Sequence, residues 1–212
     1  MSLNIIYEDN QIIALDKEPG QTVIPGRGVD ESTTLVRELE KYTGGKIYVV
    51  HRLDRDTSGV ILFGKNASVH RELSLQFERR ETEKTYLAAV AGVMEGEGEI
   101  DKPVYQFGSG RMGVDKRGKS SLTCYKVLKK MCDSSYLEVK PATGRRHQIR
   151  VHLYSTGHPV MGDTLYGENR PVGGVSRLML HAYQISFTLS GVPKRLTAEP
   201  DSEWNDILKA LG

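Results

Sequence analysis

Residues 51–65 have the sequence HRLDRDTSGVILFGK, in which a polar stretch is followed directly by an apolar one. The apolar residues 59–65 predict a buried strand, and a second apolar run, KIYVVH, leads into the polar stretch at residue 51. A polar loop between two strands is held on a rigid frame, as functional loops commonly are. Composition alone also allows an ordinary charged turn, in which Asp54 and Asp56 cap a helix or pair with the neighbouring arginines.

Short apolar runs broken by Gly, Asn, Asp and Pro recur on both sides of this segment and predict strands. They are NIIYE (4–8), QIIALD (11–16), KTYLAAVAG (84–92), SLTCYKVLKK (121–130), YLEVK (136–140), RLMLHAYQISFTL (177–189) and KRLTAE (194–199). The first two runs are joined through Glu8-Asp9-Asn10, which predicts a hairpin and favours antiparallel pairing.

Four segments have helical spacing instead: 31–42, a segment following Asn66, 146–156 and 201–211. Asn66 and Asp201 are expected N-caps. Single helices between strand runs, without regular alternation, indicate an α+β fold with a mixed, mostly antiparallel sheet and flanking helices and loops. Surface loops are expected over 20–30 and 167–176.

Length and composition are those of an ordinary globular protein of 212 residues, with 38% hydrophobic and 26% charged residues. We expect a single catalytic domain over residues 1–212. No apolar run approaches the roughly 20 residues that span a bilayer, and the amino-terminal segment does not have the pattern of a secretory signal. The expected location is therefore the cytoplasm, with no membrane partner. Cys124 and Cys132 are expected to be reduced, structural thiols.

The formal net charge of +2 says little about partners, because screening makes local clusters more important than the total. Basic residues do cluster, at Arg111, Lys116, Arg117 and Lys119, at Lys126, Lys129 and Lys130, and at Arg145, Arg146 and Arg150. Each cluster is either solvated surface or part of a face that binds an anionic partner.

The segment HRLDRDTSG followed by VILFGK resembles the signature H-R-L-D-x-x-T-S-G-x-x-x-x-A-K of the RluA family of RNA pseudouridine synthases, and departs from it only at Gly64. Further segments resemble the family in its order: 84–88, 111–123 with Ser121 in place of Ala, 143–152 with Arg146 in place of a frequent Thr, 157–167 and 178–182. Residues 16–20 are a looser match. The resemblance implies the pseudouridine synthase catalytic fold without a separate RNA-binding module.

The resemblance implies that the protein isomerises specific uridines in structured ribosomal or transfer RNA to pseudouridine. The reaction breaks the bond between C1′ and N1, rotates the uracil and rejoins it through C5, so no cofactor or metal is needed. The implied partner is an RNA stem-loop. We expect a monomer, because one protein can embrace one stem-loop.

The resemblance implies that Asp54 is the essential carboxylate. It can attack C1′, add to C6 of the ring or abstract the 2′ proton, and the sequence leaves these three open. Each requires an ionised carboxylate in a pocket that excludes water, where an opposite charge must favour the charged form. Arg150 matches the family position that salt-bridges the catalytic aspartate.

Tyr86 matches a family tyrosine that stacks on the flipped uracil, with its hydroxyl near the site of proton loss at C5. Without the resemblance, this ring would be interpreted as core packing. Leu180 is expected to be an apolar wall of the same pocket, although a strand leucine is more often plain core.

Four basic residues are candidates for holding the RNA: Arg52, Lys84, Arg145 and Arg146. Arg52 precedes the catalytic carboxylate and can enter the RNA helix to hold the base out of the stack. Flipping a base costs a few kcal/mol, which contacts between the RNA backbone and a basic face must offset. The other three suit phosphate contacts, which position an RNA without specifying its sequence.

Three other functions fit the sequence less well. A metal-dependent hydrolase is disfavoured because His147 and His152 are five residues apart rather than four, and arginines flank them. An RNA-binding relative without catalysis would tolerate the loss of Asp54, Tyr86 or Arg150, which are all present. A nucleotide-binding enzyme lacks its motif, since no Lys-Ser/Thr follows Gly108-Ser109-Gly110.

Overall fold

The computed structural model describes residues 3–26, 28, 30–167 and 175–212 of the chain. It forms two compact units, of which unit 1 comprises Met1–Glu83 and Ala182–Glu199, and unit 2 comprises Lys84–His181 and Pro200–Gly212. The single domain expected over residues 1–212 stays a prediction. Arg27, Val29 and residues 168–174, from the loops expected over 20–30 and 167–176, lie outside the described residues.

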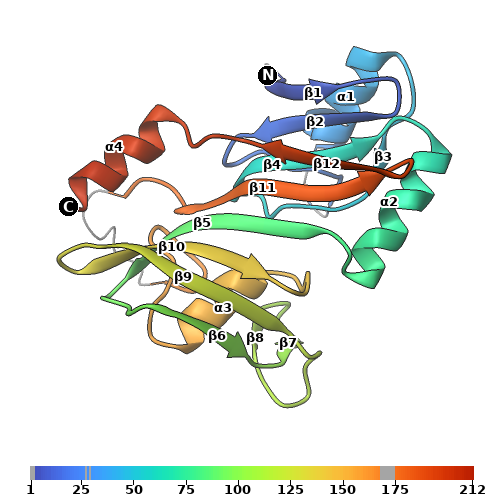
Figure 1. Cartoon of the computed structure of the whole chain (residues 1–212). Coiled ribbons are helices and arrows are strands. Elements are labelled where there is room, and N and C mark those ends of the chain that lie inside the picture. The colour runs from blue at the N-terminus through green and yellow to red at the C-terminus, as the bar shows by residue number, and fades with distance from the viewer. Residues whose placement is uncertain (1–2, 27, 29, 168–174) are drawn as a thin grey trace. The chain divides into compact units, whose positions relative to one another are not determined.

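Unit 1 is built on paired strands. Its strands are β1 (Ile5–Glu8), β2 (Ile12–Lys17), β3 (Tyr48–Val49), β4 (Ser58–Gly64), β12 (Val192–Thr197) and, from Ala182 onward, β11 (Leu180–Leu189) (Figure 1). The order is β1-β2-β4-β11, with β3 paired to β4 and β12 to β11. The strands pair antiparallel in β1–β2, β2–β4, β3–β4 and β11–β12. Residues 12–15 and 60–63 are buried, which follows from the apolar runs seen in the sequence. The expected hairpin joins β1 and β2, and the Asp9 carboxylate accepts the backbone N–H groups of Gln11 and Ile12.

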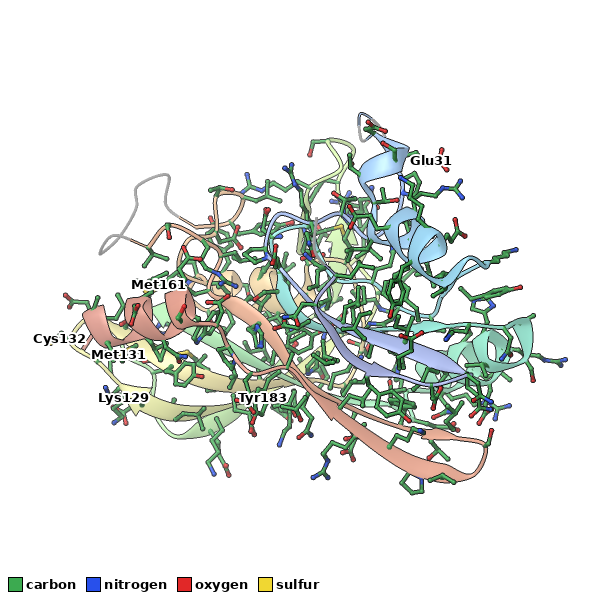
Figure 2. All side chains as sticks on the ribbon, turned by 90° about the horizontal axis from the view of Figure 1, so that it is seen from above. Glu31, Lys129, Met131, Cys132, Met161 and Tyr183 are labelled. Atoms are coloured by element: carbon green, nitrogen blue, oxygen red, sulfur yellow. The ribbon has the colours of Figure 1, made fainter. Side chains whose placement is uncertain are left out.

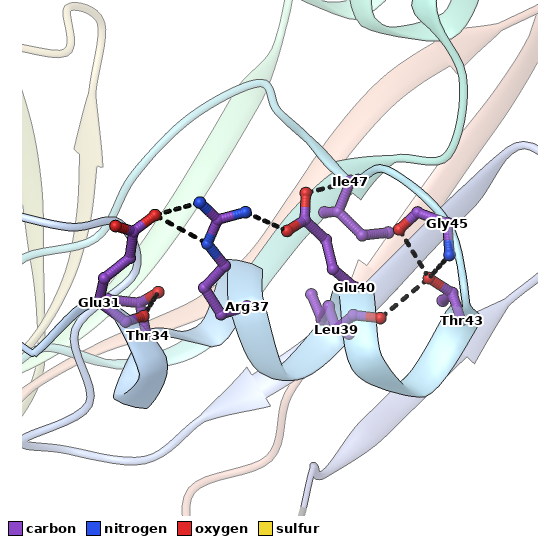
Figure 3. A network of polar contacts seen from close by, with 8 residues as sticks. All are labelled: Glu31, Thr34, Arg37, Leu39, Glu40, Thr43, Gly45 and Ile47. Atoms are coloured by element: carbon purple, nitrogen blue, oxygen red, sulfur yellow. Dashed lines mark hydrogen bonds and ion pairs between the residues drawn. The ribbon is translucent and has the colours of Figure 1, made fainter.

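Two helices accompany these strands, α1 (Leu35–Thr43) and α2 (Ala67–Arg79). Asn66 caps α2 as expected, accepting the N–H of Val69 at 3.0 Å. Part of the helix expected over 31–42 is a 3-10 turn, Glu31–Thr33, because Thr34 is extended and interrupts it. Arg37 bridges Glu31 on that turn and Glu40 on α1 (Figure 3), which ties the two pieces together.

Unit 2 has a second set of strands in the order β5-β10-β9-β6, all paired antiparallel. Their bounds are β5 (Glu83–Ala91), β6 (Glu97–Asp101), β9 (Leu122–Lys130) and β10 (Ser134–Pro141). Strands β7 (Val104–Gln106) and β8 (Met112–Val114) form a separate two-stranded hairpin. Helix α3 (Gln148–Ser155) contacts β8, β9 and β10 (Figure 1).

The last helix, α4 (Ser202–Ala210), is capped by Asp201, which accepts the N–H of Trp204 at 2.7 Å. Trp204 is fully buried and anchors the helix. The helix ends beside Met131 and Cys132 in the turn between β9 and β10 (Figure 2). Both cysteines are free thiols, as expected.

The expected α+β class with mostly antiparallel strands is confirmed, while several boundaries differ. Helix α3 begins at Gln148 rather than at residue 146, because His147 adopts a left-handed conformation with φ 54°. Only Tyr48–Val49 of the run KIYVVH is strand, and β11 begins at residue 180 rather than 177. Among the described residues, none of the helices is both long and apolar enough to cross a membrane.

Candidate active site

The loop His51–Thr57 lies between β3 and β4 and is fixed at its first residue. His51 accepts the backbone N–H of Leu62 at 3.0 Å through Nε2, and its ring stacks on Phe77 with centroids 4.8 Å apart. Within the loop, the N–H of Thr57 donates to the carbonyl of Asp54 at 3.2 Å. A strand follows this loop, so its aspartates do not cap a helix. Asp54 is half-buried and Arg52 is exposed.

Lys17 anchors the residue that follows Asp54. Its side chain is 0% exposed, and its Nζ donates to the carbonyls of Glu18 at 2.9 Å, Gln21 at 2.9 Å and Arg55 at 2.6 Å. The Arg55 carbonyl also accepts the N–H of Gly20 at 2.9 Å. A buried ammonium is tolerated only when it is hydrogen-bonded, and the three carbonyls meet this need. Because they come from residues 18–21 and from Arg55, Lys17 joins the segment 18–21 to the loop His51–Thr57. This role of Lys17 was not predicted from the sequence, where its signal is a lysine at the end of an apolar strand.

Gly59, the glycine of the T-S-G part of the signature, lies at a position where a side chain does not fit. Its φ is +107°, and a Cβ there would lie 2.2 Å from the carbonyl oxygen of Ala182 in β11. A side chain at this position would push β4 away from β11. Glycine at residue 59 therefore allows β4, which begins at Ser58 directly after the loop, to lie close against β11.

In unit 2, Lys84 and Tyr86 lie two residues apart on β5, so they share a face of the strand. Both are half-buried, and Tyr86 is paired with Val139 of β10. A Cβ on Gly144 would lie 3.8 Å from Lys84 Nζ, which places the ammonium beside the segment that carries Arg145 and Arg146.

The segment before α3 is held by the buried side chain of Gln148. Its Oε1 accepts the Thr143 hydroxyl at 2.6 Å and the Arg145 N–H at 3.0 Å, and its Nε2 donates to the Leu122 carbonyl at 2.9 Å. These contacts fix the turn and leave Arg145 half-buried and Arg146 exposed. The basic residues of this turn are therefore presented by a rigid support.

Arg150 is buried on α3 and forms a two-point ion pair with Asp163, with Nε to Oδ2 at 2.7 Å and Nη2 to Oδ1 at 2.8 Å. Its guanidinium also lies 5.2 Å from the ring centroid of Tyr166. The Asp163 side chain is 0% exposed and also accepts the N–H groups of Leu165 and Tyr166. Burial alone would raise the pKa of Asp163, but the Arg150 guanidinium and these N–H groups lower it below its ordinary value.

Leu180 is buried at the start of β11, as an apolar wall of a pocket would be. The next residue, His181, has its ring centroid 5.7 Å from that of Trp204. Asp54 and Arg52 belong to unit 1, and the other candidate residues belong to unit 2. The pairing of Arg150 with Asp54, and the assigned roles, stay predictions.

The histidines that suggested a metal site have other contacts. His147 Nδ1 lies 2.7 Å from the Tyr166 hydroxyl, and the two ring nitrogens of His152 each lie 2.9 Å from an oxygen, of Thr123 and of Lys102. Burial lowers the pKa of His152, which favours the neutral ring. In the part of the chain that the structure describes, no three His, Cys, Asp or Glu side chains are grouped to hold a metal ion.

The family of this chain follows from its match to a sequence model. The sequence model of the family described as RNA pseudouridylate synthase matches residues 11–155, more than half of the chain. The chain belongs to the RNA pseudouridylate synthase family. RNA pseudouridylate synthases are RNA isomerases, so the predicted enzyme class and the resemblance are confirmed.

Two relatives and one solved structure show how far the similarity to RNA pseudouridylate synthases extends. The dual-specificity RNA pseudouridine synthase RluA of Vibrio cholerae is 41% identical over 189 residues, 87% of this chain and 77% of the relative. The tRNA pseudouridine synthase C of Pasteurella multocida is 36% identical over 98% of this chain and 96% of its own. Human RNA pseudouridylate synthase domain containing 1 has a TM-score of 0.80 at 26% identity, covering 99% of this chain and 94% of that chain. The predicted catalytic fold is thereby confirmed.

Proposed function

We propose that this protein isomerises specific uridines in structured ribosomal or transfer RNA to pseudouridine, with Asp54 as the essential carboxylate. The observation that carries the proposal is the family match over residues 11–155, which includes Asp54, Tyr86 and Arg150. One relative is named for transfer RNA and another for dual specificity, which favours testing both RNA classes. The proposed partner is an RNA stem-loop, bound by one protein monomer in the cytoplasm, where the bacterial relatives' RNA substrates are made.

The proposed reaction moves one bond and one proton. The uridine flips out of its helix, the bond between C1′ and N1 breaks, the base turns, and C1′ bonds to C5. C5 then loses its proton to solvent and N1 takes one up, so no atom is gained or lost overall. Asp54 attacks C1′, adds to C6 or takes the 2′ proton, and each route needs its carboxylate next to the flipped nucleotide. The rigid anchoring of residues 51 and 55 supports this role, because a reacting group must be held in place.

Arg52 is proposed to keep the flipped base out of the helix, because it is exposed two residues before Asp54. Lys84, Arg145 and Arg146 are proposed to bind phosphates, and the closeness of Lys84 Nζ to Gly144 supports grouping them. Leu180 is proposed to contact the uracil, and Arg150 to favour the ionised form of Asp54.

Tyr86→Phe is expected to slow isomerisation by about 100-fold or more, the usual range for losing an acid–base group, while the fold is retained. Tyr125→Phe, which removes the hydroxyl of another half-buried tyrosine, on β9, is the matched control and should keep native turnover. Single-turnover rates on a modifiable RNA measure both. Equal rates for the two variants would remove the Tyr86 hydroxyl from the chemistry.

The substrate class is tested by incubating the protein separately with unmodified ribosomal RNA and with an unmodified transfer RNA pool. Carbodiimide adducts of pseudouridine stop reverse transcription and locate each product. The proposal predicts new stops at one or a few unpaired uridines in at least one pool. New stops in neither pool would contradict the proposed substrate class.

A further inference from the structure

A groove of about 400 Å³ in unit 2 is lined by Arg145 and Arg146, which are already proposed to bind phosphates, and by residues of the β7–β8 hairpin that have no assigned role. The β7–β8 hairpin and the turn after it form one side, and residues 144–146 form the other. Four basic residues line it: Arg117, Lys119, Arg145 and Arg146. A basic groove of this volume can hold a ligand with a negative charge and an apolar part.

The hairpin side of the groove is a rigid support. Val104 and Met112 are buried with Val151 and Tyr166 in one cluster, and the Tyr166 hydroxyl accepts the N–H of Met112 at 3.2 Å. The backbones of Val104 and Lys119 exchange hydrogen bonds of 3.0 and 2.9 Å. The turn that carries Lys119 is therefore fixed to β7.

An aromatic and guanidinium surface lies on this hairpin. The rings of Tyr105 and Phe107 meet edge to face with centroids 5.2 Å apart, and the Arg117 guanidinium lies 4.5 Å from the Tyr105 centroid. Phe107 is 38% exposed, although it is a large apolar side chain. A Cβ on Gly113 would lie 2.7 Å from the Phe107 ring, so this glycine leaves the space that the ring occupies.

Asp115 fixes the plane of the Arg117 guanidinium by accepting Nε at 2.9 Å and Nη2 at 2.8 Å. These hydrogen bonds hold the pKa of Asp115 at about 2, so the carboxylate stays charged at neutral pH. Exposed aromatic rings and guanidinium planes are the surfaces on which proteins stack unpaired bases. Phe107 and Arg117 together have this geometry.

The opposite side of the groove is formed by residues 144–146, of which Arg145 has one unusual donor atom. Arg145 Nε is buried and has no hydrogen-bond partner among the residues that the structure describes. A buried donor without a partner is costly, and the cost is greater for a charged group. Arg145 lines the groove with Lys119 and Arg146, and these three positive charges favour a phosphate there, whose oxygens can accept hydrogen bonds from the guanidinium.

We propose that this groove, together with the exposed Phe107 ring that lies beside its lining residues Tyr105 and Arg117, binds one unpaired nucleotide of the RNA substrate, with the base stacked on Phe107 and Arg117 and the phosphate at Arg145. The inference rests on the proposed function and adds a substrate requirement to it. The RNA must present, besides the uridine that reacts, a second nucleotide whose base is free to stack. Stacking is tolerant of base identity, so this site selects loops over duplexes rather than a sequence.

The test compares two fluorescein-labelled probes in binding to the full chain: a dodecauridine, and a dodecamer with the same backbone whose residues are abasic. Phe107→Ala is expected to weaken binding of the dodecauridine about fivefold or more and to leave binding of the abasic probe unchanged. Phe107→Tyr keeps the ring and is the matched control, with native affinity for both probes. Lys119→Gln should weaken both probes equally and reduce the salt slope of binding by about 0.7.

Unchanged affinity of Phe107→Ala for the dodecauridine would overturn the proposal, as would an equal loss on both probes. A native protein that does not prefer dodecauridine to the abasic probe would overturn it as well. These readouts are independent of pseudouridine formation. Failure here together with a positive result from carbodiimide mapping would reject the groove and keep the isomerase.

Discussion

Asp54→Asn is expected to abolish pseudouridine formation while leaving RNA affinity nearly unchanged. Asparagine has the same shape as aspartate, but its amide is neither a nucleophile nor a base. The contacts that hold the ends of the loop come from His51, Lys17 and the Arg55 carbonyl, and the substitution leaves them intact. Filter binding and carbodiimide mapping of the same RNA measure the two effects separately.

A large loss of RNA affinity in Asp54→Asn would contradict this expectation, because it would assign the residue to binding or to folding rather than to chemistry. Asp56→Asn is the matched control, since it makes the same chemical change at an exposed position of the same loop.

Asp163→Ala is expected to lower the free energy of unfolding by about 3–5 kcal/mol, the usual effect of removing one partner from a buried ion pair. The substitution would leave the buried Arg150 guanidinium without this carboxylate and the N–H groups of Leu165 and Tyr166 without their acceptor. Asp206→Ala is the control, because the Asp206–Lys209 pair is exposed and such pairs contribute about 0–1 kcal/mol. Urea denaturation measures the free energy of unfolding of both variants. Equal losses in the two variants would contradict the predicted contribution of the buried ion pair.

The same ion pair gives stability a pH dependence with a defined sign. The pKa of Asp163 is lower in the folded protein than its ordinary value, so the unfolded chain takes up the proton first as the pH falls. The stabilisation that this ion pair gives is therefore complete above the pKa of an aspartate in the unfolded chain, about 4, and is lost as the pH falls through the lower pKa of Asp163 in the folded protein. Unfolding midpoints from pH 6 down to about pH 3 should fall more steeply for the native protein than for Asp163→Ala.

The sequence predicted the elements whose patterns are long and apolar. β2, β4 and β5 came from continuous apolar runs, and Asn66 and Asp201 predicted the starts of α2 and α4 through their capping side chains. Strands β6, β7 and β8 were missed, because they have three to five residues each and lack apolar alternation. Their positions depend on pairing with distant segments, which a local pattern does not contain.

The candidate site residues stay predictions, and the sequence signals for them differ. Asp54 and Arg52 became candidates because one contiguous segment that resembles the family signature carries them, whereas the support that Lys17 gives depends on Arg55, which lies 38 residues further along the chain. A lysine at the end of an apolar strand gave a weak signal, and its three carbonyl partners became visible only in the fold. The early start predicted for α3 failed because helical spacing does not reveal the left-handed residue His147.

The most direct test of the central claim is release of tritium from RNA labelled at C5 of uridine, measured side by side for the native protein, Asp54→Asn and Asp56→Asn. Isomerisation through C5 frees one proton from that carbon for each product. Release is expected from the native protein and from Asp56→Asn, and none from Asp54→Asn. Release by Asp54→Asn at the native rate would contradict the proposed role of Asp54.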